Sequence, residues 1–207
     1  MATSGSRDFT LDVAEVIEEA YERCGIEIRT GYEAETARRS LNLMFAEWAN
    51  RGVNLWTVKL GTQALTAGTA TYSLSSTIAD LLEVVVRRDG VDFEVQRISR
   101  GEYQSQPNKA TQGRPSSFYF NRQVTPEINL WATPENSTDV LRYYYVQRIE
   151  DADALVNDVD APFRFLPCMA SGLAYYLSVK RAPDRVQLLK TIYEEEFQRA
   201  ADEDEDR

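Results

Sequence analysis

Four aspartates within ten residues are the nearest approach to a metal site in this sequence: Asp151, Asp153, Asp158 and Asp160. Carboxylate oxygens are the ligands that Ca²⁺ prefers, and Asp151-x-Asp153 matches the opening of a calcium-binding loop. The rest of the pattern fails, because Leu155 stands at the next ligand position and Val156 stands where the loop needs glycine. We expect a hydrated acidic segment, with a weak cation site as the alternative.

Paired carboxylates are the second candidate for chemistry, since a glycosidase uses two of them as acid and base or nucleophile. The candidate pairs are Glu194 with Glu195 and Glu15 with Glu18. Both pairs lie on the polar faces of predicted helices, where charged side chains are usually hydrated. We therefore predict no catalytic residues, and an enzyme that uses carboxylates remains the alternative.

The chain has no histidine and two cysteines, Cys24 and Cys168. Without imidazole, neither a Cys/His zinc site nor a Cys–His nucleophile pair can form. We interpret both cysteines as buried apolar thiols, with a disulfide as the alternative.

Gly61-Thr62 and Gly68-Thr69 precede predicted strands, which is the wrong context for a phosphate-binding loop. The sequence predicts no metal and no cofactor.

Aromatic side chains suggest contact surfaces. The run Tyr143-Tyr144-Tyr145 could stack nucleic-acid bases, but on a strand Tyr143 and Tyr145 share one face while Tyr144 takes the other. Packing inside the protein or against another subunit is the better interpretation. We predict four interface anchors, with core packing as the alternative for each: Trp48, Trp56, Tyr143 and Tyr145.

Charge and length limit the classes of function. The net charge of −10 argues against a protein that grips nucleic acid, which needs concentrated Lys and Arg. Eight acids fall in the last fifteen residues, so an acidic tail is expected. No apolar run approaches the length needed to span a membrane. The N-terminus lacks the apolar core of a secretory signal. We therefore expect a short mobile arm at the N-terminus and synthesis in the cytoplasm. A chain of 207 residues allows one or two domains.

Two amphipathic helices are predicted at the N-terminus. Residues 10–24 repeat apolar positions at helical spacing, with Thr10 as the expected N-cap and Gly25 as the stop. A second helix begins at the Thr30-x-x-Glu33 capping box and ends at Gly52. The short link between them indicates a helical hairpin.

From residue 55 the spacing of apolar residues changes from the helical period to alternation along the chain. Short strands are predicted at residues 55–60, 63–65, 71–74, 82–88, 91–98, 117–121, 128–131 and 140–148. Asp89-Gly90 is a type I′ turn pair and the strongest hairpin signal in the chain. Residues 101–115 form a long loop or contain one short helix. These strands predict an antiparallel sheet or a small sandwich.

Helical spacing returns after an acidic linker at residues 150–160. One helix covers about 165–180, with Pro167 in its first turns, and another runs from about Asp184 to Ala200. The predicted fold is α+β: N- and C-terminal helical hairpins pack into a four-helix bundle, and an antiparallel β domain is inserted. The predicted divisions are 1–54, 55–149 and 150–207, the last packing with the first.

Five segments at the two helical ends of the chain form a recognisable set: Asp160-Ala161-Pro162-Phe163-Arg164-Phe165-Leu166-Pro167, Gly172-Leu173-Ala174-Tyr175-Tyr176-Leu177, Lys180-Arg181-Ala182-Pro183, Tyr193-Glu194-Glu195-Glu196-Phe197, and Phe45-Ala46-Glu47-Trp48-Ala49-Asn50-Arg51-Gly52-Val53-Asn54-Leu55-Trp56. Together they resemble the head-to-tail adaptor (tail accessory factor) family of short-tailed bacteriophages. The β region resembles the family in length and pattern alone.

The resemblance implies a virion structural protein at the head–tail junction rather than an enzyme. Members commonly form a ring of twelve copies that docks on the portal protein and receives the tail nozzle or hub protein, while genomic DNA passes through the lumen without specific binding. An acidic lining suits a channel that must release DNA. Family members often continue past the fourth helix into a segment that reaches into the portal; here that segment is absent or the charged tail replaces it.

Two other functions stay open at this point. One is a virion-associated cell-wall hydrolase that uses carboxylates, and the other is a small cytoplasmic binding module unrelated to phage.

Overall fold

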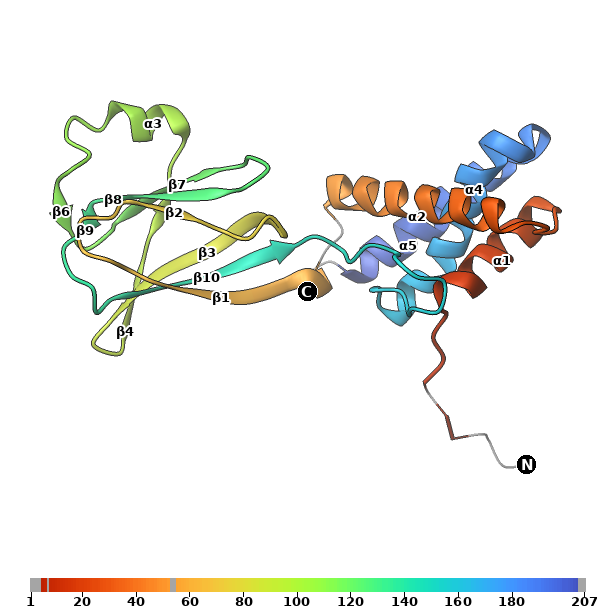
Figure 1. Ribbon diagram of the computed structural model, residues 1–207, viewed down its shortest axis with the longest axis horizontal. Helices are drawn as coiled ribbons and strands as arrows, with labels where there is room; N and C mark the ends of the chain where they lie inside the picture. Colours follow the sequence, from red (N-terminus) through yellow and green to blue (C-terminus); the bar gives the residue numbers. More distant parts are fainter. Residues whose placement is uncertain (1–4, 7, 53–54, 205–207) are drawn as a thin grey trace. The chain divides into compact units, whose positions relative to one another are not determined.

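The computed structural model describes residues 5–6, 8–52 and 55–204 (Figure 1). Part of the expected N-terminal arm and the last residues of the acidic tail lie outside these ranges. The chain divides into two compact units, which we call the helical unit and the β unit. The helical unit runs to Trp56 and resumes at Ile149, and the β unit is Thr57–Arg148. The fold is α+β, with helices and antiparallel sheets.

The helical unit contains the four expected helices: α1 (Val13–Cys24), α2 (Gly31–Arg51), α4 (Leu166–Arg181) and α5 (Val186–Asp204). The Thr30–Glu33 capping box and the stops at Gly25 and Gly52 are confirmed. The expected N-cap of α1 is wrong, because Asp12 takes that place and forms a capping box with Glu15. Two further bonds hold this start, since Val13 donates its N–H group to the backbone oxygen of Asn157 and Ala14 donates to that of Leu155.

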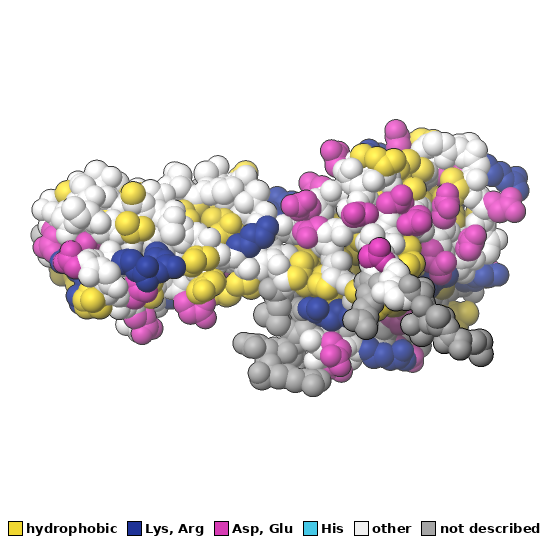
Figure 2. Space-filling view, turned by 90° about the horizontal axis from the view of Figure 1, so that it is seen from below, with side chains coloured by type: hydrophobic (Ala, Val, Ile, Leu, Met, Phe, Trp, Pro, Cys, Tyr) yellow, Lys and Arg dark blue, Asp and Glu magenta, His cyan; other side chains and the backbone are white. Residues whose placement is uncertain are grey.

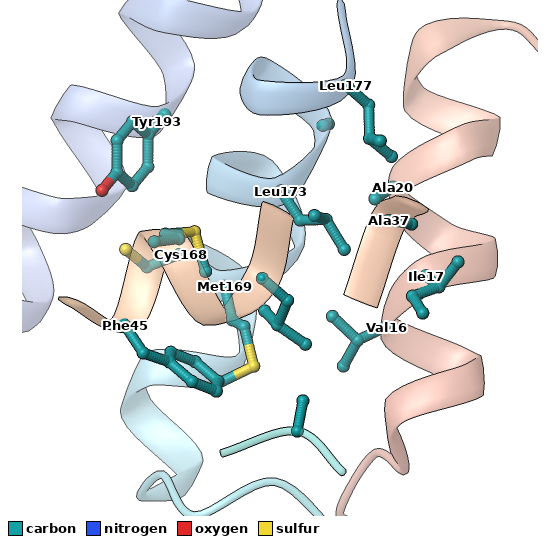
Figure 3. Close-up of a cluster of buried hydrophobic side chains, with 14 of the residues drawn as sticks. Val16, Ile17, Ala20, Ala37, Phe45, Cys168, Met169, Leu173, Leu177 and Tyr193 are labelled. Atoms are coloured by element: carbon teal, nitrogen blue, oxygen red, sulfur yellow. The ribbon is translucent and has the colours of Figure 1, made fainter. Parts of the chain in front are cut away.

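Helix α4 lies at the centre of the helical unit and contacts α1, α2 and α5. Leu173 and Leu177 of α4 point toward Ile17 and Ala20 of α1 (Figure 3). Gly172 lies where α4 is closest to its other neighbours. A Cβ atom at this position would lie 2.5 Å from the sulfur of Met44 and 2.7 Å from the ring of Tyr193. The close packing of α4 therefore depends on a residue without a side chain.

The acidic segment after Ile149 is docked on the helices rather than free. The amide of Asn42 on α2 pairs with the backbone of Ala152 in both directions, at 2.8 Å and 3.3 Å. Asp12 and Asp158 form an isolated β-bridge. Ala152 is buried, so this segment forms part of the helical core.

The β unit holds two four-stranded sheets and one short strand pair. The first sheet has the order β1 (Val58–Ala64), β10 (Val140–Gln147), β3 (Ile78–Arg88) and β4 (Val91–Glu94). The second has the order β2 (Thr71–Ser73), β8 (Glu127–Trp131), β7 (Ser117–Asn121) and β5 (Gln96–Arg97). The short pair joins β6 (Gln112–Gly113) to β9 (Thr133–Pro134). Buried side chains from both sheets form one hydrophobic cluster.

Several details of the β unit differ from the expectation. Residues 55–57 form a 3₁₀ turn, and β1 then runs through Gly61 without a break. Gly61 fits because the ring of Tyr143 occupies the space where a Cβ atom would lie. The expected strand 91–98 is divided between the two sheets, and the pairs β5–β7 and β6–β9 are parallel. Of the two forms expected for residues 101–115, the one with a short helix is confirmed by α3 (Arg100–Ser105).

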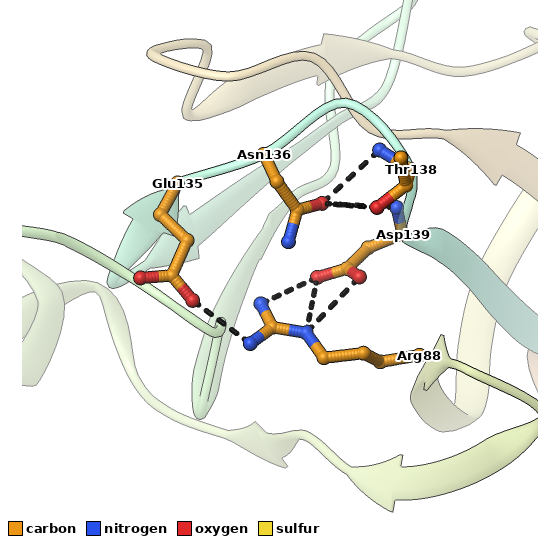
Figure 4. A network of polar contacts seen from close by, with 5 residues as sticks. All are labelled: Arg88, Glu135, Asn136, Thr138 and Asp139. Carbon is orange, nitrogen blue, oxygen red and sulfur yellow. Dashed lines mark hydrogen bonds and ion pairs between the residues drawn. The ribbon is translucent and has the colours of Figure 1, made fainter.

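A buried ion pair fixes the loop between β9 and β10 (Figure 4). Asp139, whose side chain is 1% exposed, accepts three hydrogen bonds from Arg88 at the end of β3. Arg88 also pairs with Glu135 at 2.8 Å. The side-chain oxygen of Asn136 accepts bonds from Thr138 and from the backbone of Asp139. The buried charge is therefore neutralised and held in place.

Candidate interaction surfaces

One concave surface lies on the helical unit, between α1 and the first turns of α4. Its volume is about 450 Å³. Its floor is apolar and is formed by Phe9, Leu11, Phe163, Leu166, Pro167 and Ala170. Phe9 and Phe163 meet edge to face with ring centres 6.4 Å apart, yet they remain 64% and 70% exposed. Exposed aromatic rings within an apolar floor are typical of a contact surface.

The rim of this surface is acidic. It is formed along α1 by Glu15, Glu18, Glu19, Glu22 and Arg23. Arg23 pairs with Glu19 at 2.8 Å and also faces Glu196 of α5 at 3.7 Å, so it neutralises little of the remaining charge. Figure 2 shows many Asp and Glu side chains on the visible face of the helical unit. We call this surface the acidic groove.

Trp48, a predicted interface anchor, is fully buried in the helical core. Its indole N–H donates to the hydroxyl of Tyr193 at 2.9 Å, and that hydroxyl donates to Glu47 at 2.9 Å. Burial raises the pKa of Tyr193, so this phenol stays neutral and keeps its proton for Glu47. Trp48 therefore packs in the core of the helical unit, which is the alternative to an interface anchor, and it has no exposed surface for a neighbouring subunit.

Trp56 also packs inside the helical unit, although it is partly exposed. Its ring lies 4.8 Å from that of Phe165, and its indole N–H donates to the backbone oxygen of Asp160 at 3.1 Å. Trp48 contacts the same Phe165 ring at 5.5 Å. The two tryptophans therefore share one aromatic cluster.

Tyr143 and Tyr145 lie together on the core side of strand β10. Their ring centres are 5.9 Å apart, Tyr143 is buried and Tyr145 is partly buried. Tyr144, which was expected on the opposite face, points outward and is 48% exposed. Its partner across the ladder to β1 is Leu60, which is also exposed. The apolar surface on this sheet thus involves the tyrosine between the two predicted anchors.

The acidic candidates lie in separate parts of the helical unit. Asp151, Asp158 and Asp160 line one surface depression, but within the described ranges no three Cys, Asp or Glu side chains form a group that could hold a metal ion. Arg51 binds Glu194 through two hydrogen bonds and lowers the pKa of its carboxyl. A glycosidase acid needs a raised pKa, so Glu194 has the wrong electrostatic environment for that role.

The two cysteines lie in the helical unit and are free. Cys24 donates its thiol to the backbone oxygen of Ala174 at 3.3 Å. Burial raises the pKa of both thiols, which keeps them protonated and unreactive.

Sequence reasoning missed the acidic groove. The signal was present, because Glu15, Glu18 and Glu22 repeat at helical spacing along α1. The apolar floor was not visible, since it joins residues near positions 10 and 165.

Comparison with known proteins gives one family. The family model described as SU10 adaptor protein matches residues 11–207, which covers both units. No curated protein matches the chain. No helix within the described ranges is both long and apolar enough to cross a membrane.

Proposed function

The chain belongs to the SU10 adaptor protein family, a family of phage head-to-tail adaptors, and we propose that it forms a ring that docks on the portal protein. The ring extends the DNA channel and connects it to the tail nozzle or hub protein. The observation that carries this proposal is the family match, which spans both the helical unit and the β unit.

The helical unit suits the wall of such a ring. Its helices share one hydrophobic core and pack around α4, and we propose that they form a four-helix bundle that repeats around the ring. A ring of identical subunits joins two different surfaces of each copy, and twelve copies is the number that we propose. The acidic groove is one surface available for such contacts.

The charge of the chain supports passage of DNA rather than binding. With a net charge of −10, a ring would repel the phosphate backbone along its lumen. DNA then moves through the channel without specific contacts.

Sedimentation velocity of the purified chain, alone and mixed with portal rings from the same phage, tests the proposal. We expect the chain to co-sediment with the portal and to add the mass of a complete ring. End-on micrographs of the complex would give the copy number. A chain that stays apart from the portal at every concentration would contradict the adaptor function.

A further inference from the structure

The acidic groove has unneutralised charge above an apolar floor. Glu18 and Glu22 are exposed, and neither forms an ion pair within the described part of the chain. The nearest cation on the rim, Arg23, is already engaged by Glu19. The chemistry that fits this groove is a surface with both cationic and exposed apolar side chains.

The helical unit carries a surface of that kind where α4 joins α5. Residues 179–190, which we call the basic corner, include four exposed cations and one acid: Lys180, Arg181, Arg185, Lys190 and Asp184. Val179 and Leu188 add apolar side chains that are 58% and 62% exposed. In a chain of net charge −10, this stretch is unusual in being both basic and partly apolar.

The basic corner borders the acidic rim of its own chain, but it does not reach the apolar floor of the groove. Arg185 donates to the backbone oxygen of Arg23 at 3.1 Å, and Lys180 donates to Ser40 at 2.7 Å. Ala182, between them, is buried. These contacts fix the corner beside the last turn of α1, whereas the groove floor is formed by residues 9–11 and the first turns of α4. Val179 lies nine residues beyond Ala170 on α4, about 13 Å along the helix axis. A contact between the corner and the apolar floor therefore requires a second molecule.

We propose that the acidic groove of one subunit receives the basic corner of a second copy of this chain. Burial of Val179 or Leu188 on the apolar floor supplies attraction, and the opposite charges select the orientation. The two surfaces differ, so each bound pair leaves one free groove and one free corner, and the contact continues until a ring closes. This inference rests on the proposed adaptor function and names the surfaces that would join its subunits.

Charge reversal on each side tests the contact. The first variant carries Glu18→Lys and Glu22→Lys, and the second carries Arg181→Glu and Lys190→Glu. Each variant alone brings like charges together, so we expect ring assembly on portal rings to need at least about tenfold more protein. Glu35→Lys on α2 and Arg199→Glu on α5 are matched controls, since both side chains are exposed outside the two surfaces. The controls should assemble like the wild type.

Mixing the two variants gives a sharper result. In an alternating ring each corner then meets a groove of opposite charge, so an equimolar mixture should recover assembly to within about threefold of the wild type. The chain that carries all four substitutions should recover in the same way. Circular dichroism of each variant before mixing checks that its helices are intact.

The outcomes separate this inference from the adaptor function. Reversed variants that assemble like the wild type would overturn the groove–corner contact and leave the adaptor function intact. Variants that lose assembly and do not recover on mixing would assign the groove to the portal, which also overturns it. A wild-type chain that never assembles on the portal would contradict the adaptor function and this contact together.

Discussion

At the scale of single residues, Gly172 shows how closely the helices approach one another. Replacing it with alanine would place a Cβ atom 2.5 Å from the sulfur of Met44. We expect Gly172→Ala to lower the free energy of unfolding by about 1–3 kcal/mol, because the neighbours must move in a close-packed core. Urea unfolding followed by tryptophan fluorescence measures the change.

Gly101→Ala is the matched control for that substitution. Gly101 lies on α3, where an added Cβ atom would have only one neighbour within 4 Å, Ser99 at 3.9 Å. Helix propensity then favours alanine, and stability should be equal or slightly higher. Equal losses at both positions would show that crowding is not the cause at Gly172.

Tyr193 connects α5 to α2 through its hydroxyl group. Tyr193→Phe leaves the indole N–H of Trp48 buried without an acceptor, which costs about 1–3 kcal/mol. Thermal unfolding would measure the loss. Tyr32→Phe, at an exposed position on α2, should leave the unfolding temperature unchanged.

At the scale of elements, the β3–β4 hairpin depends on its turn. Asp89 and Gly90 have φ angles of 50° and 82°, as a type I′ turn requires. Gly90→Ala adds a side chain in open space, so strain of the backbone is the only penalty, about 1–2 kcal/mol. Hydrogen exchange of the β3–β4 amides should speed up, while exchange in the helical unit stays the same.

Local signals explain why many elements were predictable. The capping box at Thr30–Glu33, the turn at Asp89–Gly90 and the strand at 117–121 each depend on neighbours in the sequence, and all three are confirmed. The start of α1 was misplaced because Asp12 is also held by residues 155–158, far along the chain. Element boundaries fail where distant contacts determine them.

At the scale of the whole molecule, the β unit has the features of an insertion. Its first and last strands are neighbours, with Val58 opposite Val146, and it has its own core. We expect the excised fragment 57–148 to fold alone, and to show cooperative thermal unfolding and dispersed amide resonances. A fragment with the spectrum of an unfolded chain would show that the helical unit is needed for its stability.

Alkaline pH should destabilise the molecule. Burial raises the pKa of five tyrosines: Tyr21, Tyr103, Tyr143, Tyr176 and Tyr193. A phenol with a raised pKa in the folded state contributes stability that is present below its unfolded pKa, about 10, and is lost as pH rises beyond it. Urea midpoints should therefore fall between about pH 9.5 and 11, and Tyr193→Phe should reduce the fall.

Sequence patterns alone predicted the four long helices and most of the longer strands in their order, because periodicity, caps and turns are local. The resemblance at the two helical ends also indicated the phage adaptor family. Which side chains are available for contact depends on the tertiary fold. Trp48 and Tyr143 are buried, Tyr144 is exposed, and Phe9 and Phe163 come together over one groove. Burial depends on residues that lie more than a hundred positions away, such as Tyr193 for Trp48, and no local pattern contains that information.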